Sequence, residues 1–284
     1  MAKGLFATYH PAVCMLFFLA AICFSFCSMQ PMYIIITCVM AGVYVVFLKG
    51  GRALARSFLL FVPLVAFIAI LNALFNSTGA TVIWRYGILN VTLEGLFYGL
   101  VIAGMLIAVL LWFSCYNEVM TEDKFTYLFG RAVPTLSLMV SMVSRWVPRM
   151  ASRGRSIYDS QEALIGGYDT TKRGAISRGL RMATVLAGLG MEDSIQTSDS
   201  MRARGYGTAR RTSYARYRWH ARERVVLVVL IVLAVVNAVG MVMGTMGFDY
   251  YPTIVGLRFV WWGYATYALM LALPLLVELE RAFK

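Results

Sequence analysis

The chain carries the apolar run VVLVVLIVLAVVNAVGMVMG at Val225–Gly244. The run contains no charged residue, and an α-helix needs about 20 mostly apolar residues to cross the hydrocarbon core of a bilayer. A helix pairs its own backbone groups in a medium without water, whereas an exposed strand or loop leaves them unpaired. We therefore predict a transmembrane helix at this position.

The composition of the whole chain agrees with a membrane protein. Of its 284 residues, 60% are hydrophobic and only 14% are charged, whereas about 25% of the residues in a typical soluble domain are charged. This composition excludes an ordinary cytosolic enzyme, a disordered tail and a secreted disulfide scaffold.

Five further stretches are apolar and long enough to cross a bilayer. Their predicted bounds are Pro11–Met29, Met32–Leu48, Ser57–Leu74, Leu96–Cys115 and Phe259–Val277. The stretch Phe125–Ser144 is interrupted by Arg131 and Pro134, and we predict a helix at the membrane edge there rather than a span. The fold class is therefore predicted to be all-α, a polytopic membrane protein with about six transmembrane helices.

Most of the net charge lies in one insert between the fourth and fifth predicted spans. The net charge of the chain is +12, and Arg145–Arg224 contributes 16 basic and 7 acidic residues to it. Because basic loops stay in the cytoplasm, we predict a cytoplasmic insert and, with six spans, two cytoplasmic termini. The predicted organisation is residues 1–124 with spans one to four, residues 125–224 with the membrane-edge helix and the insert, and residues 225–284 with spans five and six.

The insert is predicted to form two long amphipathic helices. The first begins at Val147-Pro148, because proline is favoured near a helix start, and ends at Gly166-Gly167. The second runs from Ser177 to Ala203. Gly205 suits the left-handed conformation that caps a helix, which places Arg204 in the last turn beside the exposed carbonyl groups.

The sequence lacks motifs for catalysis. It contains no G-x-x-x-x-G-K-[ST] nucleotide-binding loop, no H-E-x-x-H and no G-x-S-x-G. The predicted spans hold almost no ionisable side chains, which ion-coupled carriers usually need near the membrane midplane. We predict no enzymatic activity, no cofactor and no metal site, and a membrane platform that depends on an outside source of energy.

The residues of the insert leave three interpretations open. Arg204 and Gly205 can form an ordinary helix end, in which the arginine only complements the helix dipole. The insert as a whole can also lie on anionic lipid as amphipathic helices. Nucleic-acid binding is the least favoured, because Tyr214, Tyr217 and Trp219 precede a span and suit the membrane interface.

The segment Ser198–Gly207, with the sequence SDSMRARGYG, resembles the Ala-Arg-Gly signature of the EcfT/CbiQ family. These proteins are the transmembrane coupling subunits of energy-coupling factor (ECF) transporters. Other segments are similar to the family in the right order: Leu71–Phe75 with Gly79, Thr92–Gly95, Ser144–Pro148 and Arg210–Tyr214. Family members usually carry two such motifs, and the first of them falls here at Ser160–Gly166. Gln161 and Ala163 match this first motif, but Leu164 stands in place of its arginine.

The resemblance implies a coupling subunit of an ECF-type importer in the cytoplasmic membrane of a prokaryotic cell. Its partners would be two cytoplasmic ABC ATPase subunits, a small membrane subunit that captures a vitamin or a metal ion, and the lipid bilayer, but no nucleic acid. The implied ATPase-coupling residues are Gln161, Ala163, Leu164, Ser200, Ala203, Arg204 and Gly205. The alternatives are a permease subunit of another ABC-type importer and a non-transport membrane scaffold.

Overall fold

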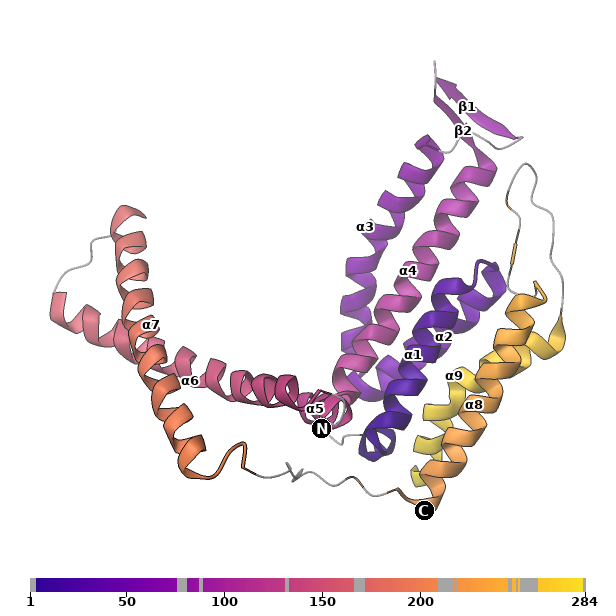
Figure 1. Cartoon of the computed structure of the whole chain (residues 1–284). Helices are drawn as coiled ribbons and strands as arrows, with labels where there is room; N and C mark the ends of the chain where they lie inside the picture. The colour runs from indigo at the N-terminus through magenta and orange to yellow at the C-terminus, as the bar shows by residue number, and fades with distance from the viewer. Residues whose placement is uncertain are drawn as a thin grey trace. The chain divides into compact units, whose positions relative to one another are not determined.

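The protein divides into two compact units. The structure, a computed structural model, describes residues 4–75, 81–86, 89–130, 133–165, 172–208, 217, 219–244, 247–248, 250 and 260–282. One unit, here called the membrane unit, comprises Met1–Lys124 and Tyr217–Lys284, and the other, here called the helical unit, comprises Phe125–Arg216. In Figure 1 the membrane unit carries the colours of both ends of the chain, indigo to magenta and orange to yellow, and the helical unit carries the colours between them.

The membrane unit consists mainly of apolar helices. Its elements are η1 (Leu5–Thr8), α1 (Pro11–Cys27), α2 (Pro31–Lys49), α3 (Gly51–Phe75), β1 (Val82–Tyr86), β2 (Leu89–Thr92), α4 (Leu93–Val119), α8 (Ala221–Val242) and α9 (Trp261–Ala282). Among the described residues, five helices are long and apolar enough to cross a membrane, namely α2, α3, α4, α8 and α9. The predicted all-α polytopic membrane fold is therefore confirmed.

The remaining predicted span corresponds to α1, which is apolar but has only 17 residues. A helix of that length rises about 25 Å, which is at the short end of what can cross a bilayer. The helix begins at Pro11, a residue preset for the first turn, and His10 accepts a hydrogen bond from the Ala12 backbone N–H at 3.2 Å. The apolar run therefore begins and ends with defined caps.

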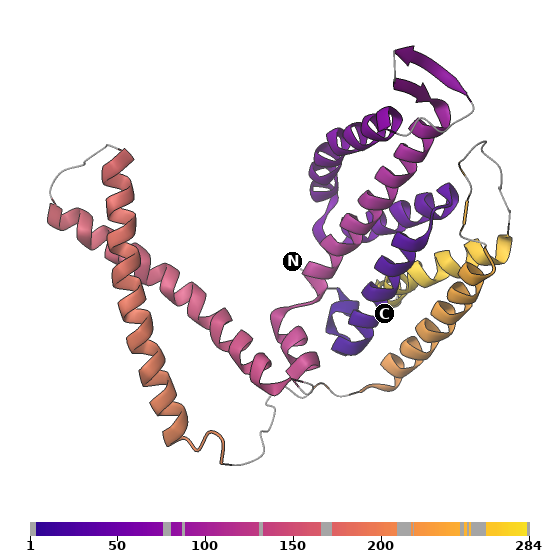
Figure 2. The ribbon, with the colours of Figure 1, turned by 45° about the horizontal axis from the view of Figure 1, so that its top comes forward.

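Aromatic side chains form the centre of the membrane unit. Trp112 on α4 is fully buried and packs edge-on against Phe17 of α1, with ring centroids 5.5 Å apart. Tyr33 of α2 packs in the same way against Tyr267 of α9, at 5.1 Å. Helices α2 and α4 pack together, as do α8 and α9 (Figures 1 and 2). Large apolar side chains on the outer faces are exposed, as lipid-facing residues are in a membrane protein.

A short β-hairpin precedes α4, and the sequence patterns did not predict it. Strands β1 and β2 pair antiparallel. The hairpin is tied to the helix because the buried Glu94 side chain accepts hydrogen bonds from the Thr81 backbone N–H, at 3.2 Å, and hydroxyl, at 2.7 Å. The Thr92 side chain caps α4 by accepting from the Gly95 N–H at 3.2 Å. The helix therefore starts at Leu93, three residues before the predicted bound.

The helical unit contains most of α5 (Glu122–Gly130), and all of α6 (Pro134–Ile165) and α7 (Lys172–Ala203). The prediction that a coupling helix opens at Val147-Pro148 is wrong, since Pro148 lies inside α6. Proline removes one helical hydrogen bond, but α6 packs against α7 on both sides of Pro148, and this packing holds the helix together. The stretch Phe125–Ser144 belongs to two helices, α5 and α6, rather than to one.

Candidate functional site

Helices α6 and α7 run in antiparallel directions and cross, with one glycine of each helix at the contact. A Cβ on Gly154 of α6 would lie 3.0 Å from Met182 Cε and 3.4 Å from Leu186 Cδ1 of α7. A Cβ on Gly190 of α7 would lie 3.0 Å from Cζ2 of Trp146. The missing side chains therefore let the two 32-residue helices approach closely at the crossing (Figure 2).

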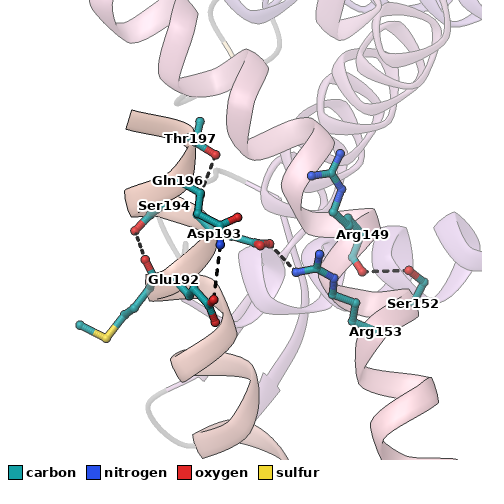
Figure 3. A network of polar contacts seen from close by, with 9 residues as sticks. Arg149, Ser152, Arg153, Glu192, Asp193, Ser194, Gln196 and Thr197 are labelled. Atoms are coloured by element: carbon teal, nitrogen blue, oxygen red, sulfur yellow. Dashed lines mark hydrogen bonds and ion pairs between the residues drawn. The ribbon is translucent and has the colours of Figure 1, made fainter. Parts of the chain in front are cut away.

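An ion pair joins the two helices beside this crossing. The Arg153 guanidinium of α6 donates to the Asp193 carboxylate of α7, and Figure 3 shows the two side chains pointing toward one another. The side chains are 39% and 24% exposed, and a pair of that exposure is worth about 0.2–1 kcal/mol. Sequence reasoning missed this contact, because no local pattern relates two residues that are 40 positions apart.

The end of α7 has the hydrogen bonds of a Schellman motif. The Tyr206 backbone N–H donates to the Met201 carbonyl at 3.0 Å, and the Gly205 N–H donates to the Arg202 carbonyl at 2.9 Å. Gly205 has a φ of 78°, so the predicted left-handed glycine cap is confirmed. Arg204 follows the last helical residue, Ala203, but its backbone N–H still donates to the Ser200 carbonyl at 3.2 Å, so Arg204 caps the last turn.

The residues around this cap are accessible. Ser200, Ala203 and Arg204 are exposed, and Gly205 is half-buried. Within the described part of the chain no ion pair engages the Arg204 guanidinium. The helix end thus presents an arginine next to two small residues, an arrangement that lets a partner approach the backbone closely.

The earlier motif lies at the end of α6. Gln161 is half-buried and Ala163 is exposed, and Leu164 is the second-to-last residue of the helix. The predicted stop at Gly166-Gly167 lies outside the described residues, as does the Arg210–Tyr214 segment.

The structure does not bring the two motifs together. Leu164 lies ten residues beyond Gly154, or about 15 Å along α6 at 1.5 Å per residue. Arg204 lies eighteen residues beyond Leu186, or about 27 Å along α7 by the same rise. Because the helices run in antiparallel directions, the motifs lie on opposite sides of the crossing. Such a pair can contact two separate partners, one at each helix end.

The candidate residues at the two helix ends are one arginine, one glutamine, one leucine, one serine, two alanines and one glycine. Among the described residues there is no group of three or more histidine, cysteine, aspartate or glutamate residues that could hold a metal ion.

The fold and the site together define a polytopic helical membrane protein that carries a long crossed helix pair. A comparison with protein-family models matches residues 5–215 to CbiQ, the cobalt transport protein family. The chain belongs to this family, and it is a component of a membrane transport system. No curated protein matches it.

Proposed function

We propose that the chain is the transmembrane coupling subunit of an ECF-type importer for a metal ion or a vitamin. In this role it transmits the ATP-driven motion of two cytoplasmic ATPase subunits to a small membrane subunit that captures the substrate. The observation that carries the proposal is the exposed Arg204 beyond a Schellman-capped helix end, in a chain of the CbiQ family.

The physical argument begins with the source of energy. The sequence has no nucleotide-binding loop, so ATP is hydrolysed by partners in this proposal. An arginine fork pairs bidentately with carboxylates, and breaking a buried pair by removing one partner costs about 3–5 kcal/mol. If Arg204 is paired in this way with an acidic groove on an ATPase, the end of α7 stays attached to the ATPase as the ATPase moves, because separating the two would leave a buried charge unpaired.

The separation of the two motifs supports two ATPase contacts. The end of α7 would bind one ATPase through Arg204, Ala203, Gly205 and Ser200. The end of α6 would bind the other through Gln161, Ala163 and Leu164. Because Leu164 stands where the family has an arginine, the second contact would depend more on apolar packing than on ion pairing.

The orientation in this proposal follows from charge. The helical unit contains most of the basic insert, so it would face the cytoplasm, with both termini on the same side of the cytoplasmic membrane.

Purification of the chain from its native membrane with a C-terminal affinity tag tests the function. We expect two ATPase chains and one small apolar membrane protein to copurify at stoichiometric amounts. Retention of a single large permease partner would favour another ABC-type importer, and purification without any ATPase would favour a non-transport scaffold. Either result would overturn the proposal.

A further inference from the structure

The N-terminal segment Leu5–His10, here called the anchor segment, is packed into the membrane unit. Phe6 is only 1% exposed and lies among Tyr9, Phe17 and Phe18, with ring centroids 5.9, 5.5 and 6.4 Å away. Its backbone carbonyl accepts a hydrogen bond from Cys14 Sγ at 3.3 Å. The anchor segment is therefore held by α1 on one side.

The anchor segment is also held by the end of α9. The Phe6 backbone N–H donates to Glu278 Oε1 at 3.0 Å, and Glu278 is buried. A Cβ on Gly4 would clash with the same oxygen, so a larger residue at this position would require the Glu278 side chain to move. A buried carboxylate needs hydrogen-bond donors, and the anchor segment supplies one of them.

The first connection to the helical unit touches the anchor segment. The chain leaves the membrane unit at Lys124, a lysine that is only 5% exposed. Its Nζ donates to the Ala7 carbonyl of the anchor segment and, at 3.0 Å, to the Val119 carbonyl at the end of α4. Since a buried ammonium group is costly without acceptors, these bonds fix the position of Lys124.

The second connection touches the same segment. The chain re-enters the membrane unit at Tyr217, and the Trp219 ring stacks on the His10 ring with centroids 3.9 Å apart and planes 19° apart. Tyr217 approaches His10 edge-on at 6.2 Å. Burial lowers the pKa of His10, and this effect is larger than the opposing effect of the Glu223 carboxylate. The lowered pKa favours the neutral form of the His10 ring in the stack with Trp219.

We propose that the anchor segment is a mechanical clamp that fixes both connections to the helical unit, with Lys124 and Trp219 as positioning residues. The proposal rests on the coupling function proposed above. Motion of α6 and α7 can reach the membrane unit only through the two connections. Lys124 in the first connection and Trp219 in the second both contact the anchor segment, and the anchor segment is hydrogen-bonded to Glu278 of α9. Without the clamp, movement of α6 and α7 would be absorbed where the chain leaves and re-enters the membrane unit.

Distance measurements between spin labels test the clamp without requiring any partner. Labels are placed at Ala55→Cys on α3 and Ala187→Cys on α7, both exposed positions, in a full-length chain inserted in nanodiscs. The five native cysteines are replaced, and Cys14→Ser keeps a hydrogen-bond donor for the Phe6 carbonyl. We expect Trp219→Ala and Lys124→Met to broaden the distance distribution markedly. Trp219→Phe and Lys124→Arg should restore a width close to the native one.

Matched controls separate the clamp from a general loss of structure. Trp262→Ala removes a tryptophan of similar exposure, 47% against 44% for Trp219, and it lies at the far end of α9 from Glu278. Arg224→Met removes an exposed cation from α8. Both controls should leave the distribution unchanged. A native width in Trp219→Ala, or equal broadening in the controls, would overturn the clamp.

A second measurement links the clamp to transport. The same variants, without the labels, are purified with the bound ATPases and the substrate-capturing subunit, reconstituted in liposomes and supplied with radioactive Co²⁺. We expect Trp219→Ala to keep ATP hydrolysis but to import less Co²⁺ per ATP hydrolysed than the wild type and Trp262→Ala. An unchanged ratio, or a loss of ATPase binding in Trp219→Ala, would overturn the clamp. Failure of the wild-type chain to bind any ATPase would instead refute the proposed function, while the label distances would still report on the clamp.

Discussion

Arg204 is the residue on which the proposed coupling depends most. We expect Arg204→Glu to abolish transport and ATPase assembly, because it places a carboxylate against the acidic groove proposed on the ATPase. Arg204→Lys should be intermediate, since a point charge cannot reproduce the two parallel hydrogen bonds of the guanidinium. Copurified ATPase and substrate uptake measure the effect, at unchanged levels of the chain in the membrane.

Arg202 serves as the control for Arg204. It is exposed as well, but two positions along a helix correspond to a rotation of about 200°. Arg202→Ala should therefore cost less than either Arg204 variant. Full substrate uptake by the Arg204→Glu variant, with both ATPases bound, would contradict the proposed role of Arg204 in ATPase binding. Arg204 would then be an ordinary solvent-exposed residue at a helix end.

Gly205 adopts a backbone conformation that other residues avoid. Its φ is 78°, and an L-residue in the left-handed region costs about 1–2 kcal/mol. We expect Gly205→Ala to speed amide hydrogen exchange at position 205 and at Tyr206, the two donors of the Schellman motif. Gly188→Ala is the matched control, because its Cβ would meet nothing within 4 Å and alanine favours a helix interior over glycine by about 1 kcal/mol.

At the scale of the elements, the crossing of α6 and α7 combines close packing with one ion pair. A double-mutant cycle with Arg153→Ala and Asp193→Ala should show a coupling of about 0.2–1 kcal/mol, because both side chains are partly exposed. The free energy of unfolding of the detergent-solubilised chain measures it. Simple additivity of the two single variants would show that the pair adds nothing to the crossing that Gly154 and Gly190 already hold.

The end of α6 should differ from the end of α7 in how it binds. We expect Leu164→Asp to weaken ATPase assembly, because it places a charge in a contact proposed to be apolar, and Leu164→Ala to have a milder effect. Quantitative copurification of the ATPases compares the two variants. Normal assembly and transport by Leu164→Asp would mean that the first coupling helix does not use this position.

At the scale of the whole molecule, the orientation of the chain in the membrane is the main prediction. In a cysteine-free background, Thr170→Cys, between α6 and α7, should react with an impermeant maleimide only from the cytoplasmic side. Gly247→Cys, in the connection between α8 and α9, should react only from the opposite side. Both expectations come from the distribution of basic residues, and strong external labelling of Thr170→Cys would contradict them.

The transmembrane helices and the cap of α7 could be predicted from residues that are close together in the chain. An apolar run of about 20 residues has only the helical solution in hydrocarbon, so the stretch at Val225–Gly244 indicated its helix directly. The glycine cap at Gly205 was equally predictable, because left-handed backbone is a local property. The family-like signature around Arg204 is also contiguous in the sequence.

Contacts between distant residues decided the rest. Pro148 was predicted to begin a helix, but packing against α7 on both sides keeps it inside α6. The Arg153–Asp193 pair depends on the crossing of two helices. The clamp joins Phe6 to Glu278, which is 272 positions away, and Ala7 to Lys124. Local patterns carry no record of such pairs, because their stability comes from burial and hydrogen bonding that exist only once the helices have assembled.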